Sequence, residues 1–184
     1  MLFNQFSEHR TPFAVQYITL SQHQASIQSA PTGLDNPAGI IYDTIVNIVM
    51  DTNVLLAALR SSRGASHRLL LSVGTGRFEL ALSVPLVLEY EEVTLRYHTE
   101  LGLSKTDVKD ILDYLCAVAV RQRVYYLWRP FLPDPKDDML LEVAVAAACQ
   151  AIVTFNLKDF AGIGEFGIQA IQPKQFLEHI GALS

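Results

Sequence analysis

The sequence predicts an α/β domain whose mainly parallel sheet is covered by helices on both faces. From Val46 onward, short apolar runs alternate with segments of helical periodicity, which is typical of strand–helix–strand units. Acidic or polar residues directly follow several of these runs, at the edge where open parallel sheets bind ligands. Half of the 184 residues are hydrophobic and 18% are charged, which excludes a wholly disordered chain.

The first 46 residues differ from the rest of the chain. They are rich in Gln, Ser, Thr and Pro, carry turn signals at 31–33 and 35–37, and contain one strand-like run at 13–20. We interpret residues 1–46 as a flexible or loosely packed N-terminal extension and residues 47–184 as the folded domain.

The predicted strands are short apolar runs, which suit strands buried on both faces of a sheet. They are residues 46–50, 78–82, 124–128, 151–154 and 168–171. Helical spacing of apolar residues predicts a helix at 106–120, and Pro85 opens another at 85–97 because proline is favoured in a first turn. The remaining predicted helices are 53–59, 67–73 and 136–150.

The net charge of −5 argues against a protein that coats DNA, since such proteins are usually basic. It is compatible with a site that collects carboxylates around a divalent metal ion. No run approaches the ~18–20 apolar residues that span a bilayer, and the N-terminus lacks a secretory pattern. We therefore expect a cytoplasmic protein with no membrane partner.

Asp51 directly follows the first predicted strand. It is either a helix N-cap or a functional residue at the carboxyl edge of the sheet, and Asn53 allows the same two interpretations. Glu89 lies within the mostly apolar stretch 86–93, where burying a carboxylate is costly unless a cation pairs with it. The alternative for Glu89 is an amphipathic helix whose glutamates face solvent.

A second group of acids precedes the predicted helix 136–150. Asp134 can cap this helix, Pro135 can be its first residue, and Asp137 falls at the acidic position of a capping box. Capping gives no role to Asp138, so Asp138 is the acid that we assign to the functional site. Polar residues also follow the strand 151–154, and Asp159 is among them.

Several carboxylates that converge on one sheet edge repel each other and destabilise the fold unless a cation is present. Oxygen ligands with few histidines suit Mg²⁺ or Mn²⁺ rather than zinc. The natural chemistry of such a site is phosphodiester hydrolysis.

Four segments, in chain order, resemble the motifs of PIN domains. They are the strand that ends in Asp51-Thr52-Asn53, Ser83 followed by Glu89, the segment from Asp138 to Thr154, and residues 154–160. The similarity covers residues 46–175, and the nearest group is the prokaryotic PIN proteins described as toxin components of toxin–antitoxin pairs. The resemblance implies a three-layer α/β/α sandwich and metal-dependent ribonuclease activity.

The resemblance also implies roles for particular residues. Asp51, Glu89 and Asp138 match the catalytic carboxylates that bind Mg²⁺ or Mn²⁺, and Asp137 is the second choice as a ligand. Thr154 is implied as a supporting hydrogen-bonding residue.

The chain departs from the family pattern at the fourth acid. Asn156 stands where many members have Asp, and the nearest acid is Asp159. Asn156 can still offer a neutral oxygen to a metal ion, with Asp159 as a substitute catalytic acid and Asn53 as a further supporting residue.

Three functions compete. The first is an Mg²⁺- or Mn²⁺-dependent endoribonuclease, the toxin of a type II toxin–antitoxin system. The second is a PIN-fold RNA-binding or regulatory protein that has lost activity, which Asn156 favours. The third, a phosphatase of the haloacid dehalogenase type, needs a second Asp where Asn53 stands.

Partners are predicted more coarsely. Candidate RNA contacts are Arg60, Arg63, Arg68 and Lys158, each with ordinary surface charge as the alternative. An antitoxin and a homodimer follow from the resemblance, and the apolar stretch 125–131 is either core or a contact with a second subunit.

Overall fold

The computed structural model describes residues 45–182, which form one five-stranded sheet with helices around it. All strand pairs are parallel, and the order across the sheet is β3-β2-β1-β4-β5. The strands are β1 (Val46–Met50), β2 (Phe78–Leu82), β3 (Val120–Arg121), β4 (Ala151–Val153) and β5 (Gln169–Ile171). The predicted parallel α/β sheet is thus confirmed.

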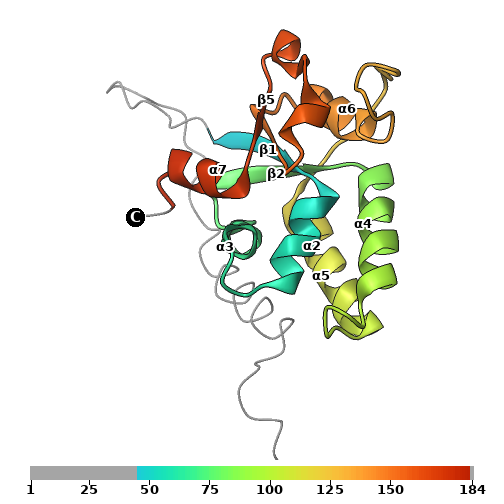
Figure 1. Cartoon of the computed structure of the whole chain (residues 1–184), viewed down its shortest axis with the longest axis vertical. Coiled ribbons are helices and arrows are strands. Elements are labelled where there is room, and N and C mark those ends of the chain that lie inside the picture. Colours follow the sequence, from blue (N-terminus) through green and yellow to red (C-terminus); the bar gives the residue numbers. More distant parts are fainter. Residues whose placement is uncertain (1–44, 183–184) are drawn as a thin grey trace, which may run out of the picture. The chain divides into compact units, whose positions relative to one another are not determined.

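Helices cover the sheet on both sides (Figure 1). Helices α2 (Thr52–Arg60) and α3 (Ala65–Ser72) lie on one side of β1 and β2, and α6 (Asp138–Ala146) lies on the other side, in contact with β1, β2 and β4. The remaining helices are α4 (Val84–Tyr97), α5 (Lys105–Val118), α7 (Pro173–His179) and the 3₁₀ turns η1 (Leu157–Phe160) and η2 (Ile163–Phe166). This is the α/β sandwich that the sequence predicts.

The central strand β1 has helices on both faces, which explains why its last three residues are apolar and buried. Ile48, Val49 and Met50 are all 0% exposed. Met50 pairs with Val153 of β4, so these two strands end at the same edge of the sheet. Polar residues that follow parallel strands are therefore brought together there.

The third predicted strand is wrong in position. Residues 124–128 belong to no strand, and the strand that pairs with β2 is the shorter β3, in which Val120 and Arg121 oppose Ala81 and Leu82. Tyr125 is 80% exposed. The aromatic, β-branched composition of 124–128 is typical of strands, but β2 ends at Leu82 and leaves this run no ladder to join.

The predicted helix 136–150 is also too long, because α6 begins at Asp138 and ends at Ala146. The predictions for residues 1–44 lie outside the described residues. Within 45–182, no helix is both long and apolar enough to cross a membrane.

Candidate functional site

Asp51 lies at the carboxyl end of β1 and is held there by residues from two distant parts of the chain. Its Oδ2 accepts hydrogen bonds from Thr154 Oγ1 at 2.6 Å and from Asn53 Nδ2 at 2.7 Å. The Asn53 amide also lies 3.3 Å from Thr154 Oγ1, so the three side chains form one connected group. Thr154 is fully buried and Asp51 is only 7% exposed. The aspartate is thus fixed in one orientation.

Asp51 also caps α2. Its Oδ1 accepts from the backbone N–H of Asn53 at 3.1 Å, which confirms the capping interpretation. Burial raises the pKa of Asp51, and the nearby Glu89 carboxylate adds to this rise. Capping and a place in the acidic site therefore coexist in one residue.

Glu89 reaches the same edge from α4. The carboxylate is half-buried and accepts a hydrogen bond of 2.5 Å from Thr52 Oγ1, so it does not simply face solvent. The next residue, Tyr90, is fully buried and donates its hydroxyl to the Met50 carbonyl at the end of β1. Burial raises the pKa of Tyr90 well above its ordinary value, and the charges of Asp51 and Glu89 contribute. Tyr90 thus remains a neutral donor that ties α4 to the strand carrying Asp51.

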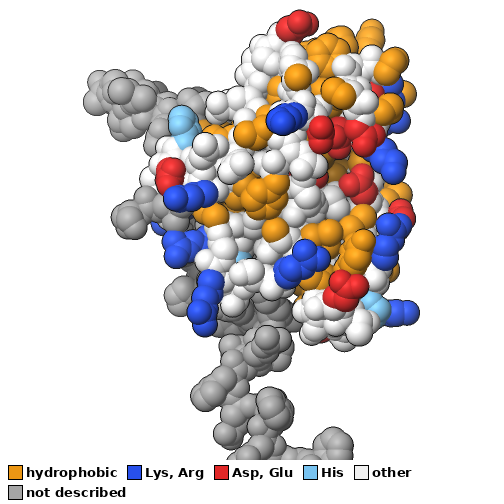
Figure 2. Space-filling view, in the orientation of Figure 1, with side chains coloured by type: hydrophobic (Ala, Val, Ile, Leu, Met, Phe, Trp, Pro, Cys, Tyr) orange, Lys and Arg blue, Asp and Glu red, His pale blue; other side chains and the backbone are white. Residues whose placement is uncertain are grey.

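Asp137 completes the group from the turn before α6. Its pKa is raised from 3.8 to about 6. Burial is the largest cause, and the charges of Asp51, Asp134, Asp159 and Glu89 add to it. Asp137 therefore lies within electrostatic reach of all the acids at this edge. Figure 2 shows acidic side chains gathered on this face between α4 and α6.

The raised pKa of Asp137 predicts a pH-dependent stability. The pKa of Asp137 is about 6 in the folded state and 3.8 without the fold. Between pH 3.8 and about 6, the folded state therefore binds more protons than the unfolded state. Without metal, the free energy of unfolding should therefore fall as pH rises from 4 to 6. Asp137→Asn should remove this fall and raise stability at pH 7 by ~1 kcal/mol, a value reduced for solvent screening of a half-exposed group.

Urea denaturation of both proteins in EDTA at several pH values measures this effect. The surface variant Asp113→Asn, which removes an exposed carboxylate from α5, serves as the control. Parallel pH profiles for wild type and Asp137→Asn would show that neither burial nor the neighbouring acids raise the pKa of Asp137 in the fold.

Asp138, the neighbour of Asp137, points into the protein. It is 0% exposed, and its Oδ1 accepts from the backbone N–H groups of Phe131 at 3.2 Å and Leu132 at 2.8 Å. Its Oδ2 is buried and has no hydrogen-bond partner among the described residues. The structure thus places Asp51 and Glu89 within electrostatic reach of Asp137 and directs Asp138 to the segment before α6.

Glu142, one turn along α6, holds the same segment. Its carboxylate, whose side chain is 2% exposed, pairs with both Arg129 Nε at 2.9 Å and Arg129 Nη2 at 3.0 Å. It also accepts from the backbone N–H of Trp128 at 3.2 Å. The hydrogen bond and charge of Glu142 raise the pKa of Arg129. Two buried acids of α6 therefore fix the loop that precedes the helix.

The predicted capping of the helix 136–150 is wrong. Asp134 accepts from the backbone N–H of Lys136 within a turn, and Pro135 precedes the helix. Asp137 occupies the N-cap position but makes no side-chain cap hydrogen bond. Its carboxylate is therefore available to the acidic site.

The fourth motif contributes backbone contacts and one acid. Asn156 is exposed, and its backbone N–H donates to Thr154 Oγ1 at 2.9 Å. Asp159 is half-buried in η1, and its charge raises the pKa of Asp137. Within 45–182, the acid of this motif that reaches the site is thus Asp159.

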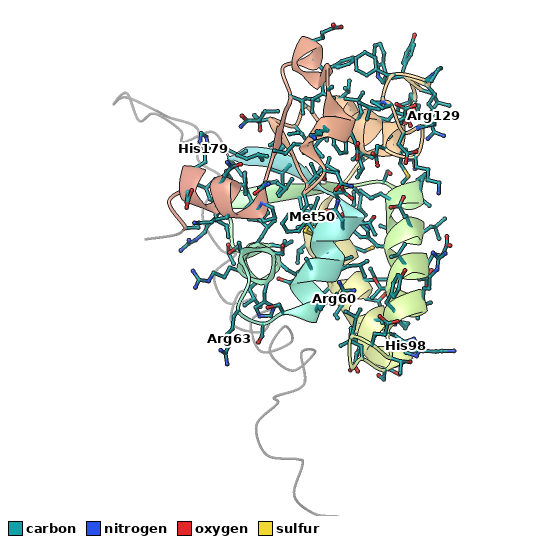
Figure 3. All side chains as sticks on the ribbon, in the orientation of Figure 1. Met50, Arg60, Arg63, His98, Arg129 and His179 are labelled. Atoms are coloured by element: carbon teal, nitrogen blue, oxygen red, sulfur yellow. The ribbon has the colours of Figure 1, made fainter. Side chains whose placement is uncertain are left out.

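The predicted basic RNA contacts are distributed unequally. Figure 3 shows Arg60 and Arg63 at the end of α2 far from Met50, and the nine-residue helix separates Arg60 from its N-cap by ~13 Å. Arg68 is exposed on α3. Lys158 adjoins Asp159 in η1 and is the one of the four that flanks the acids.

The donor chemistry of the site fits a divalent cation that prefers oxygen ligands, since its side chains offer carboxylate and amide oxygens. Within the described residues, no three His, Cys, Asp or Glu side chains lie close enough to hold an ion as they stand. The fit therefore rests on the chemistry of these oxygen donors and on the negative charges of the acids. These charges add to the effect of burial in raising the pKa of Asp137, and a cation would offset them.

Sequence reasoning missed several residues that support the site. These residues are Thr52, Tyr90 and Glu142, and Glu142 alone carried a signal in the sequence. Glu142, like Glu89, lies within an otherwise apolar stretch, where burying an unpaired carboxylate is costly. The argument that identified Glu89 therefore also applies to Glu142. The hydroxyls of Thr52 and Tyr90 gave no signal, because their partners come from other parts of the chain.

Comparison with known proteins agrees with this geometry. A family model described as PIN domain matches residues 47–158, from the second residue of β1 through β4, and includes all the site acids except Asp159. No curated protein matches the sequence. The chain belongs to the PIN domain family.

Proposed function

We propose that this protein is an endoribonuclease that depends on Mg²⁺ or Mn²⁺. PIN domains are generally nucleases. The observation that carries the proposal is the fixed Asp51 carboxylate at the carboxyl end of β1, held by Thr154 and Asn53, with the charge of Glu89 close enough to raise its pKa. Natural sequences do not collect repelling carboxylates at a ligand-binding edge without a cation to neutralise them.

The proposed ligands are Asp51, Glu89 and Asp137, with Asp159 as the fourth acid. We place Asp137 ahead of Asp138, because Asp138 already accepts two backbone hydrogen bonds away from the edge. A neutral oxygen from the exposed Asn156 would serve where the metal ion needs a further ligand.

Bound metal supplies a polarised water and neutralises charge on the phosphate and the leaving oxygen. The chain's own residues position the carboxylates. Thr154 and Asn53 fix Asp51, and Thr52 fixes Glu89. Asp137, with a pKa of about 6 in the metal-free fold, is the acid whose charge depends most on a cation nearby.

The test is cleavage of a mixed RNA substrate by the full chain in Mn²⁺, Mg²⁺ and EDTA. Asp51→Asn and Glu89→Gln should each lower metal-dependent cleavage by at least ~100-fold, since residues that merely support a ligand already cost ~10–100-fold. Glu92→Gln is the matched control, because Glu92 lies on the same helix with its side chain 69% exposed.

Equal cutting by wild type and Asp51→Asn would reveal a contaminating ribonuclease and count against the proposal. A folded wild-type protein that cuts in neither metal would favour the RNA-binding or regulatory alternative, which Asn156 supports.

The toxin role is a narrower part of the proposal and rests on the resemblance to prokaryotic PIN proteins. Expression in a bacterial host should arrest growth, and Asp51→Asn should not. Co-expression with the product of an adjacent small gene should relieve the arrest and yield a complex on purification. Size-exclusion chromatography with light scattering tests the proposed homodimer.

A further inference from the structure

The segment before α6 is basic in an otherwise acidic protein. Residues 120–136, called here the basic aromatic segment, contain four Lys or Arg and one Asp, a net charge of +3 in a chain whose net charge is −5. The four cations are Arg121, Arg123, Arg129 and Lys136. Such a local reversal of charge is suited to a polyanion.

Aromatic side chains stand exposed between these cations. Tyr125 is 80% exposed, Tyr126 is 77% exposed and Trp128 is 41% exposed. A folded domain seldom leaves neighbouring aromatic rings in solvent without a binding role. In Figure 2, hydrophobic side chains lie above the acidic group, over the loop that leads into α6.

The segment is held in one shape although it belongs to no strand. Glu142 fixes Arg129 and the backbone of Trp128, and Asp138 fixes the backbone at Phe131. The Trp128 ring packs edge-on against Phe166, with the ring centroids 5.0 Å apart. The part of the segment that follows the two tyrosines is therefore preorganised, which lowers the entropic cost of binding.

The same contacts place the segment beside the acidic site. Asp138, which binds the end of the segment, is the chain neighbour of Asp137. At the other end, Arg121 and Arg123 border a cavity of about 430 Å³ that also includes Ser83, the residue that follows β2. The segment thus runs from one strand end of the carboxyl edge to the turn that carries Asp137.

We propose that the basic aromatic segment binds single-stranded RNA by stacking bases on Tyr125 and Tyr126, while Arg121, Arg123 and Lys136 contact phosphates. Unpaired bases expose their faces to aromatic side chains, whereas bases in a duplex are already stacked. This deepens the proposed function, on which it rests, by assigning to the RNA a second contact surface beside the acidic site. The strand would pass from the segment across the neighbouring carboxylates.

The test measures binding rather than cleavage, with the full chain in EDTA and a fluorescently labelled 12-nucleotide RNA. The Tyr125→Ala/Tyr126→Ala variant should bind at least ~10-fold more weakly, since each stacked base contributes enough for a five- to hundredfold effect. The Tyr→Phe pair should bind like wild type, because it keeps both rings. The Tyr→Leu pair should behave like Ala, because it keeps apolar area but loses the aromatic faces.

A second readout comes from Trp128, the only tryptophan in the chain. Its fluorescence should change on titration with single-stranded RNA and not with a duplex of the same sequence. The inference fails if Tyr→Leu binds like wild type, if duplex binds as tightly, or if Trp128 does not respond. If the Ala variant changed its oligomeric state in solution but kept its RNA affinity, the segment would instead be a contact between protein subunits.

These outcomes are separable from the nuclease proposal. Loss of RNA binding by the Ala variant with no cleavage by wild type would support RNA binding by the segment and contradict the nuclease proposal. Unchanged binding with metal-dependent cleavage would reject the segment alone.

Discussion

Asp137→Asn should abolish metal-dependent RNA cleavage, with a loss of at least ~100-fold, whereas Asp138→Asn should leave cleavage close to wild type. The two residues are adjacent, and Asp137 lies within electrostatic reach of Asp51, Glu89 and Asp159. Asp138 is fully buried and accepts from two backbone N–H groups. An Asn at 138 keeps an accepting oxygen, and its neutral amide is less costly to bury than a charged carboxylate.

Asp138→Ala provides the structural control for this pair. It removes the acceptor of the Phe131 and Leu132 N–H groups and should lower the free energy of unfolding by ~2–4 kcal/mol. Cleavage in Mn²⁺ and urea denaturation of all three variants give a complete pattern. Inactive, stable Asp138→Asn beside active Asp137→Asn would reverse the assignment and restore Asp138 as the ligand.

Arg129→Ala should lower the free energy of unfolding by ~2–3 kcal/mol. The substitution leaves the Glu142 carboxylate, whose side chain is 2% exposed, without its cation. Breaking one side of a buried pair typically costs ~3–5 kcal/mol, and the 47% exposure of Arg129 reduces this figure. Figure 3 shows Arg129 at the edge of the molecule, where water reaches it.

A second substitution distinguishes two causes of this instability, the unpaired charge of Glu142 and the lost packing of the Arg129 side chain. Arg129→Ala/Glu142→Gln should recover a large part of the lost stability, because the glutamine is neutral and can still accept from the Trp128 N–H. Arg129→Lys should be intermediate, since lysine keeps the charge but cannot reproduce the two-atom contact. A double variant as unstable as the single one would show that packing of the Arg129 side chain dominates.

Much of the fold follows from the sequence because its signals are local. A strand buried on both faces is mostly apolar, and β1, β2 and β4 contain only two polar residues, Asn47 and Glu79. The residues after such strands must lie at one edge, so Asp51 and Thr154 could be placed together before any contact was known.

The remainder depends on contacts between distant residues. The run 124–128 has strand composition, but its position is decided by Glu142, which lies fourteen residues from Trp128. The roles of Asp137 and Asp138 depend on where α6 begins, since successive helical residues point ~100° apart. Sequence periodicity locates such a boundary only to within a few residues, so the two acids could not be distinguished.

The central place of β1 also governs how the site comes into being during folding. The bond from Thr154 to Asp51 joins residues 103 positions apart, and β4 must pair with β1 before it can form. Long-range parallel pairing is slow, because the entropy of closing a long loop is lost before any contact compensates. An incompletely folded chain therefore carries Asp51 without the hydrogen bond that fixes it. The orientation of this carboxylate at the site is thus coupled to a long-range step of folding, the pairing of β4 with β1.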